Sequence, residues 1–272
     1  MRAATILLVV SVMMSGCRTS HAASAIRLEP LRVCSDPNNL PFSNREGEGF
    51  ENKIADLLAR DLGTEVRYSW WAQRRGFLRN TLNTGVCDVV LGYPAAAGPV
   101  LTTKPYYRST YVFLTRSARR LRITSFNDPI LRGLRIGVQL IGDEGANSPP
   151  AHALSRRGIV RNLVGFSVYG DYRTNSPPSA IVTAVAHGDV DAAAVWGPLA
   201  GYFAHLQSEP LDVIPVSPAT EANLPQVFDI SMAVRRDDDA RRRQLDGFIE
   251  RHSADIHRVL DQYRVPRVES DR

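Results

Sequence analysis

Metal-binding and catalytic motifs are missing from this 272-residue sequence. Its three cysteines and six histidines are dispersed, and no histidine lies at metal-ligand spacing from a cysteine or from a second histidine. The sequence has no Gly-x-Ser-x-Gly nucleophile turn and no phosphate-binding loop. We therefore expect no metal, no cofactor and no enzymatic activity. A hydrolase or dehydratase would need an acid, base or nucleophile set, and we find none.

A concentrated basic region is also missing. The sequence carries 33 Lys and Arg against 28 Asp and Glu, a formal net charge of +5, and its arginines are scattered along the chain. A nucleic-acid-binding surface needs basic residues gathered on one face. We therefore expect no nucleic-acid partner.

Long apolar runs are missing except near the amino end. Residues Ala3–Met14 are mostly apolar and follow Arg2, which is typical of a secretory signal peptide. The run is about a dozen residues long, whereas a membrane-spanning helix needs ~20. We assign residues 1–25 to this signal, which predicts export to the periplasm. Two cleavage sites fit: Met14–Cys17 resembles a lipoprotein box that would place a lipid on Cys17, and Ser20–Ala22 is a small-x-small site. A lipid on Cys17 would be the only attachment to the membrane.

The other two cysteines leave two interpretations open. After export, Cys34 and Cys87 would lie in an oxidising compartment, where a pair often forms a disulfide. Each also adjoins a predicted core strand, where buried free thiols are common. The sequence does not decide between the two.

Strands and helices alternate along the rest of the chain. The spacing of apolar residues predicts both, and glycine and proline mark many of their ends. The expected strands are 31–34, 66–70, 87–91, 109–114, 134–139, 190–196 and 228–234, with a loop and strand at 160–168; the expected helices are 50–62, 76–84, 149–157, 177–187 and 238–263. This alternation is typical of parallel sheets covered by helices.

Two such α/β units follow one another, so the chain is expected to form two lobes. Lobe 1 is predicted to comprise residues 26–116 and 225–272, and lobe 2 residues 117–224. Two strands would cross between the lobes as a hinge. A ligand would bind in the cleft, where the carboxyl ends of both sheets meet.

Several segments resemble known proteins. Ser35–Phe42, Gly49–Glu51, Thr84–Val90, Gly137–Leu140 and Gly188–Ala192 are similar to the family 3 extracellular solute-binding proteins. More narrowly, Trp70–Phe77, Lys104–Tyr111 and Gly170–Arg173 resemble the MxaJ/XoxJ proteins. The resemblance implies an α/β fold of periplasmic binding protein type II.

The resemblance also implies a function. MxaJ/XoxJ proteins are binding-protein-like accessories of PQQ-dependent methanol dehydrogenases. The implied partners are the dehydrogenase, its cytochrome c, or both, and the implied role is to assist the enzyme or its maturation through the cleft. The alternative is a receptor that delivers a small solute to an ABC transporter.

The sequence departs from the amino-acid-binding members of the family. Those members grip the ligand carboxylate with an arginine, where this chain has Ala95–Pro99. They hold the ligand ammonium with an acid, where this chain has Trp196–Pro198, and Gly142–Glu144 places negative charge at their anion-binding turn. A free α-amino acid is therefore not the expected ligand.

Candidate cleft residues are polar or aromatic and lie near strand ends, at the start of a helix or near the hinge. They are Asp36, Asn38, Asn39, Phe42, Glu51, Trp71, Gln73, Arg74, Tyr93, Tyr106, Tyr107, Arg108, Asp143, Glu144, Tyr172 and Trp196. Other interpretations stay open: the residues after the first strand are also typical turn formers, the arginines would suit a solvated surface, and one of the tyrosines could pack structurally.

Overall fold

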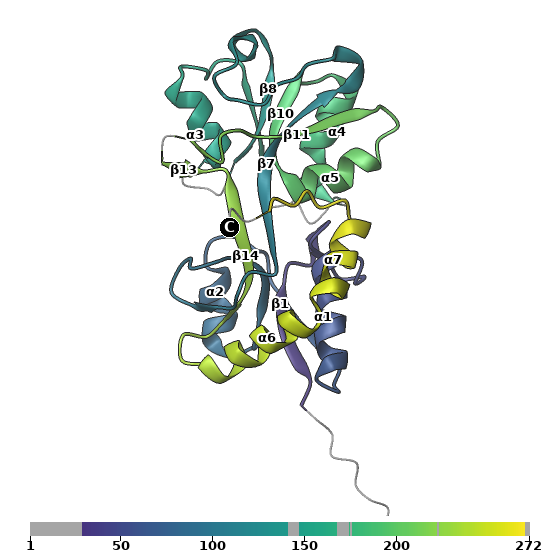
Figure 1. Ribbon diagram of the computed structural model, residues 1–272, viewed down its shortest axis with the longest axis vertical. Coiled ribbons are helices and arrows are strands. Elements are labelled where there is room, and N and C mark those ends of the chain that lie inside the picture. The colour runs from purple at the N-terminus through teal and green to yellow at the C-terminus, as the bar shows by residue number, and fades with distance from the viewer. Residues whose placement is uncertain (1–28, 141–146, 168–173, 175, 222, 270–272) are drawn as a thin grey trace, which may run out of the picture.

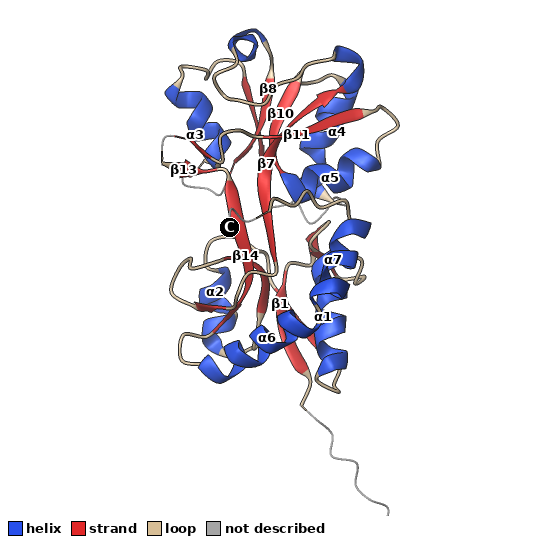
Figure 2. Cartoon of the chain, viewed as in Figure 1, coloured by secondary structure: helices blue, strands red, loops and turns tan. Residues whose placement is uncertain are grey.

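The computed structural model describes residues 29–140, 147–167, 174, 176–221 and 223–269, and it has two lobes joined by a narrow waist (Figure 1). Lobe 1 contains β1 (Leu31–Ser35), β2 (Asn38–Asn39), β3 (Ser43–Asn44), α1 (Phe50–Asp61), β4 (Val66–Trp70), α2 (Phe77–Asn80), β5 (Val90–Pro94), β6 (Leu101–Thr102), α6 (Asp239–Arg251) and α7 (Ser253–Gln262). Lobe 2 contains β8 (Ile136–Leu140), α3 (Pro149–Arg156), β9 (Leu163–Ser167), α4 (Ala180–His187), β10 (Ala192–Trp196), α5 (Gly197–His205), β11 (Leu211–Pro215), β12 (Thr220–Glu221) and β13 (Leu224–Pro225). Figure 2 shows helices flanking the strands of both lobes. Among the described residues, no helix is long and apolar enough to cross a membrane.

Two long antiparallel strands form the waist. β7 (Tyr107–Arg116) and β14 (Val227–Val234) pair with each other over four residues, from Tyr107 opposite Ile230 to Thr110 opposite Val227. Beyond this ribbon, β7 pairs with β10 and β11 in lobe 2, while β14 pairs with β5 and β6 in lobe 1. β14 therefore belongs to the sheet of lobe 1 and β7 to that of lobe 2, and their pairing joins the two sheets, as expected for a two-strand hinge.

The segment after α7 adds a third connection across the waist. The backbone amide of Val268 donates to the carbonyl of Arg108 at 3.0 Å. Ser109 donates its hydroxyl to the carbonyl of Pro266 at 2.5 Å. Tyr263 also stacks on Tyr202 of α5, with ring centroids 5.6 Å apart. The carboxyl end of the chain thus contacts both the hinge and lobe 2.

Lobe 2 is built on a sheet that is buried on both faces. Ala192 and Ala194 of β10 pack in the cluster beside α3, while Ala193 and Val195 pack in the cluster beside α4 and α5. Successive strand side chains point to opposite faces, so an unbroken apolar strand suits this position. β8 pairs in parallel with both β10 and β9, as the alternation of strands and helices predicts.

The carboxyl-terminal helix differs from its prediction. A single helix over 238–263 was expected, but the chain bends at His252 and forms α6 and α7. A straight helix of that length would extend ~39 Å. The bend, where His252 contacts Asp61 of α1, lets Phe248 of α6 and Leu260 of α7 reach the same core.

Two elements near the disulfide also differ from their predictions. The expected helix 76–84 is one short helix, α2, followed by a 3₁₀ turn at Leu82–Thr84, because Thr81 leaves the helical conformation and bonds back to the carbonyl of Phe77. The expected strand 87–91 lies at Val90–Pro94 instead, and only a single bridge, Val33 to Val89, precedes it.

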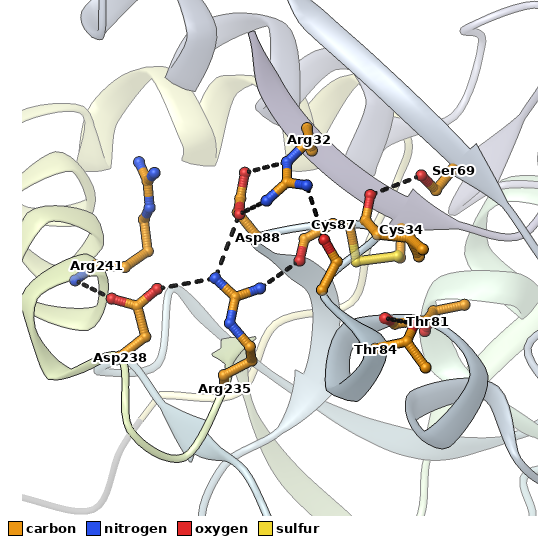
Figure 3. Close-up of polar contacts among 12 residues, drawn as sticks. Arg32, Cys34, Ser69, Thr81, Thr84, Cys87, Asp88, Arg235, Asp238 and Arg241 are labelled. Carbon is orange, nitrogen blue, oxygen red and sulfur yellow. Dashed lines mark hydrogen bonds and ion pairs between the residues drawn. A yellow bond between two sulfur atoms is a disulfide. The ribbon is translucent and has the colours of Figure 1, made fainter. Parts of the chain in front are cut away.

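Cys34 and Cys87 form a disulfide, which answers the question that the sequence left open. Beside it, Asp88 accepts hydrogen bonds from both Arg32, at 2.5 and 3.0 Å, and Arg235, at 3.3 Å (Figure 3). Arg235 also donates to the carbonyl of Cys87 at 2.6 Å. A covalent bond and a partly buried ion-pair network therefore fix the same turn of lobe 1.

Candidate functional site

A cavity of about 440 Å³ lies between the lobes, next to the hinge strands. Both lobes and both hinge strands contribute to it. Its walls are Asn39, Phe42, Glu51, Gln73, Gly92, Pro94, Tyr107, Tyr111, Gln139, Pro149, Trp196, Leu199, Phe228 and Ile230. Its size is that of a pocket for a small molecule.

Three aromatic rings form one wall of the cavity. Tyr111, Trp196 and Phe228 come from three different strands, and their ring centroids lie 5.2 to 6.3 Å apart in edge-to-face arrangements. Gln139 of β8 accepts the backbone amide of Trp196 at 2.9 Å, which fixes the end of β10. The wall is apolar and held in place by mutual packing.

A buried carboxyl group lies in the lobe 1 wall. Glu51 is the second residue of α1 and is only 6% exposed. Burial, together with the nearby charge of Asp36, raises the pKa of Glu51 to about 8. The lack of a side chain at Gly92 leaves room for the Glu51 carboxyl group, because a Cβ at position 92 would collide with its carboxyl oxygen. Gly92 also has a φ of 69°, which glycine adopts without strain.

The loop after β1 organises the rim of the cavity. Asp36 is buried, and its carboxylate accepts the backbone amides of Asn38 at 2.9 Å and Gln73 at 2.7 Å. Asn39 donates its side-chain amide to Gln73 at 3.2 Å. Asp36 therefore holds two loops together, while Asn39 and Gln73 face the cavity.

Asn38 connects the two lobes at the mouth of the cleft. Its side chain donates to the carbonyl of Thr174 at 2.8 Å and accepts the amide of Ser176 at 3.2 Å. Nearby, Leu40 of lobe 1 packs against an apolar cluster of lobe 2. The structure thus shows the lobes in direct contact.

A second hollow, the rim groove, lies outside this contact. It has a volume of about 840 Å³ and is lined by Pro37, Asn38, Leu40, Asn44, Arg45, Glu46, Glu48, Trp70, Trp71, Ala72, Arg74, Thr174 and Ser176. Trp71 is 45% exposed, a high value for so large an apolar side chain. Trp70 stacks on Tyr68 with centroids 4.4 Å apart, and the guanidinium of Arg45 lies 5.8 Å from the Trp70 ring centre.

The structure divides the predicted site residues into separate groups. Asn39, Phe42, Glu51, Gln73, Tyr107 and Trp196 line the cavity, whereas Asn38, Trp71 and Arg74 line the rim groove. Trp71 and Trp196, which we expected in one aromatic crevice, therefore lie in different hollows. Consecutive strand residues usually face opposite sides, but Trp70 and Trp71 both line the groove.

Four candidates line neither hollow. Asp36 has the structural role described above, and Tyr106 is buried behind the cavity wall, where its hydroxyl accepts the amide of Gly92 at 2.9 Å. Tyr93 is half-buried against the cluster that contains the disulfide. Arg108 faces Asp229 across the hinge, with 3.7 Å between its Nε and the carboxylate. Predictions for residues 1–25, Cys17, Asp143, Glu144 and Tyr172 lie outside the described residues.

Several cavity residues, most of them apolar, were not among the candidates predicted from the sequence. Tyr111 follows Tyr107 by four positions on one strand, so alternation would have placed both on the same face. Phe228 is in the predicted strand 228–234, which the structure pairs with β7 in the hinge. Nothing in the sequence indicates that Gln139 lines the cavity, because its place there depends on its hydrogen bond to the end of β10. Among the described residues, no group of three or more His, Cys, Asp or Glu side chains is placed to bind a metal ion.

Two α/β lobes, a two-strand hinge and a cavity between the lobes define a solute-binding protein of the periplasmic type. The chain belongs to the bacterial extracellular solute-binding proteins, family 3, whose sequence profile matches residues 31–265. It is 33% identical over 259 residues to Protein MoxJ of Methylorubrum extorquens, covering 91% of this chain and 85% of MoxJ.

Solved structures agree with this assignment. The periplasmic binding protein XoxJ from Methylobacterium extorquens AM1 is 34% identical to this chain. Its structure superposes with a TM-score of 0.73, and the match covers 88% of this chain and all of XoxJ. MxaJ from Methlophaga aminisulfidivorans MPT is 26% identical, with a TM-score of 0.77 over 88% of this chain and all of MxaJ. The resemblance to MxaJ/XoxJ proteins is confirmed, and so is the periplasmic binding protein type II fold.

Proposed function

We propose that this protein is a non-catalytic binding protein that works in the periplasm and assists a PQQ-dependent methanol dehydrogenase system. The similarity to MoxJ, XoxJ and MxaJ, which extends over nearly the whole described chain, supports this role. The proposed partner is the dehydrogenase, its cytochrome c, or both.

The exposed side chain of Trp71 is the observation that carries a partner-binding role. Tryptophan is prominent among the residues that dominate protein–protein binding energy, because it buries a large area with few rotatable bonds. Here it lies in a groove of about 840 Å³, large enough to receive side chains of a partner. Trp70 and Tyr68 stack beneath one side of this groove, so its floor is rigid.

The groove also reaches both lobes. Asn38 lines it and at the same time bonds to Thr174 and Ser176 of lobe 2. A partner seated in the groove would therefore touch a surface that exists only while the lobes are in contact. Docking at this place couples partner binding to the closed arrangement of the cleft.

Pulldown and calorimetry with the purified dehydrogenase and cytochrome c test the proposal. Trp71→Ala should weaken binding by about 30-fold, the equivalent of a ~2 kcal/mol interface residue. Leu206→Ala is the matched control, because Leu206 is also an exposed apolar side chain, at 60%, but lies in lobe 2 away from the groove. Equal binding by wild type and Trp71→Ala would place the interface elsewhere, and no binding by wild type to either protein would reject the proposed partners.

The inter-lobe cavity favours one alternative, a receptor that delivers a small solute to an ABC transporter. Its walls of apolar and uncharged polar residues around a single acid suit a small ligand. Gene neighbourhood separates the two functions. Neighbouring genes for a quinoprotein dehydrogenase and a cytochrome c support the accessory role, and genes for a permease and an ATPase support the receptor.

A further inference from the structure

Among the described residues, Glu51 is a buried acid whose carboxyl group has no hydrogen-bond or ion-pair partner. Its side chain is more than nine-tenths buried in the cavity wall, and no described residue donates a hydrogen bond to its carboxyl group or forms an ion pair with it. Burying a carboxyl group without such partners costs stability, and an apolar side chain of similar size would cost less. A carboxyl group kept in this position is typical of a binding site whose counter-ion arrives with the ligand.

The described residues around Glu51 supply no positive charge. The titratable groups that face it are Asp36 after β1, Tyr68 on β4, and Tyr106 and Tyr107 at the start of β7. All four are acids or neutral phenols. Among the described cavity residues there is no lysine, arginine or histidine either. An anionic ligand, including the carboxylate of an amino acid, would find no counter-ion among these described residues.

The aromatic wall suits the apolar part of a cation. Tyr111, Trp196 and Phe228 present rings to the cavity, and the faces of such rings attract alkylated ammonium groups. A buried carboxylate together with several aromatic rings is a general solution for binding an ammonium group that has no strong anion attached. The volume of about 440 Å³ limits the ligand to a small molecule.

We propose that the inter-lobe cavity binds a small alkylammonium ion, whose charged nitrogen pairs with the Glu51 carboxylate and whose alkyl groups pack against Tyr111, Trp196 and Phe228. This inference goes beyond the proposed accessory function and does not depend on it, since the cavity and the rim groove are separate hollows.

Binding of such a cation has a proton signature. The pKa of Glu51 is about 8, so the carboxyl group is mostly protonated near pH 6.5 and must lose its proton to pair with an ammonium group. One proton should leave the protein for each cation bound at pH 6.5, and close to none at pH 9. Affinity should rise correspondingly between these two pH values.

Isothermal titration calorimetry with defined probes tests this directly. The probes are n-propylammonium and tetramethylammonium chloride, with neutral n-propanol and anionic butyrate at the same ionic strength. At least one of the two cations should bind with proton release at pH 6.5, measured in buffers of different ionisation enthalpy, while the alcohol and butyrate should bind at least 10-fold more weakly.

Two variants separate this site from a merely structural role. Glu51→Gln should keep or raise the melting temperature of the ligand-free protein and weaken cation binding at least 10-fold, with no proton release. Glu65→Gln, which removes one exposed carboxylate from the same lobe, should bind like wild type. Equal binding of cation and alcohol, undiminished binding by Glu51→Gln, or no binding of either cation would each overturn the proposal. Dehydrogenase binding through Trp71 would be unaffected by any of these results.

Discussion

The two lobes share a local arrangement at the point where a helical turn leads into a core strand. A glycine with positive φ, Gly85 in lobe 1 and Gly188 in lobe 2, ends the turn, and an aspartate follows three residues later. The backbone amide of Asp88 donates to the carbonyl of Arg32 at 2.8 Å, and that of Asp191 donates to the carbonyl of Arg135 at 2.8 Å. The same backbone geometry therefore occurs once in each lobe.

The lobes stabilise this arrangement differently. In lobe 1, Cys87 precedes Asp88 and forms the disulfide with Cys34, two residues after Arg32. The corresponding positions in lobe 2 are Val190, before Asp191, and Gly137, two residues after Arg135; both are buried in apolar packing. Both aspartates are ion-paired, but lobe 1, which is assembled from two separate stretches of the chain, adds a disulfide, whereas lobe 2 has close apolar packing at the matched positions. Substitutions at these matched positions should therefore affect one lobe and spare the other.

Removing the disulfide should have the largest effect. Cys34→Ala with Cys87→Ala frees a loop closed over 53 residues, which constrains the unfolded chain by about 4 kcal/mol in the loop-entropy model. Hydrogen exchange should show lost protection in β1 and β5 but retained protection in β8 and β9. Reductant should act on wild type in the same way and leave the double variant unchanged. Equal loss in both lobes would show that they unfold as one unit.

Adding a methyl group at the matched position should damage lobe 2. In Gly137→Ala the new Cβ would lie 3.2 Å from side-chain atoms of Ala193, Ile181 and Phe166, which is tighter than ordinary contact. We expect a loss of about 2 kcal/mol in the free energy of unfolding, measured by denaturant titration. Gly133→Ala is the control, because a Cβ there meets nothing within 4 Å. An unchanged stability of Gly137→Ala would show that lobe 2 is less tightly packed than its contacts indicate.

Substitution of the two matched aspartates, Asp88 in lobe 1 and Asp191 in lobe 2, should have a smaller effect on the free energy of unfolding. Burial opposes ionisation of Asp88, but the hydrogen bonds and charge of Arg32 and Arg235 outweigh it and lower its pKa. The amide of Arg135 and the guanidinium of Arg119 lower the pKa of Asp191. Asp88→Asn should cost about 1.5 kcal/mol at pH 7, and Asp191→Asn less, because the Asp88 side chain is more deeply buried than that of Asp191 and bonds two guanidinium groups.

Acid titration checks this pair. A lowered carboxyl pKa contributes stability above the unfolded value near 4, and the contribution is lost as the pH falls through the folded value. Wild type should therefore lose stability between about pH 5 and 2, and Asp88→Asn should show a shallower decline than Asp191→Asn. The opposite order would mean that the exposed pair of lobe 2 is the stronger one.

The smallest effect concerns the bend at His252, which has no counterpart among the described residues of lobe 2. Hydrogen bonds to Asp61 and then Asp255 raise the pKa of His252. A raised histidine pKa contributes stability below the unfolded value near 6.5, and this is lost as the pH rises through the folded value. His252→Gln should remove under about 1 kcal/mol at pH 6 and nothing at pH 9, measured by thermal unfolding. An identical loss at both pH values would point to packing against Phe248 instead of charge.

Periodicity predicted most of the fold, since strands and helices of both lobes follow apolar spacing. It could not predict the bend at His252, which depends on a contact with Asp61 of a distant helix. Nor could it settle the disulfide, because pairing depends on the distance between two strands. In the site, the resemblance to solute-binding proteins predicted Glu51 and Trp196 as cleft residues. Only the packing of the lobes shows that Glu51 is buried without a partner among the described residues, and that Trp71 lies in a different hollow from Trp196.

The positions of the hinge strands β7 and β14 in the sequence also set the order in which the two lobes can be completed. Ribosomes and export machinery deliver a chain from its amino end, and domains tend to fold as they emerge. Lobe 2 is one continuous stretch between these two strands, so all of its own elements are available before β14, α6 and α7 appear. Lobe 1 must wait for those late elements to fill its core. During synthesis and translocation, therefore, a finished lobe 2 precedes a finished lobe 1, and a chain truncated before residue 227 would keep the former and lose the latter.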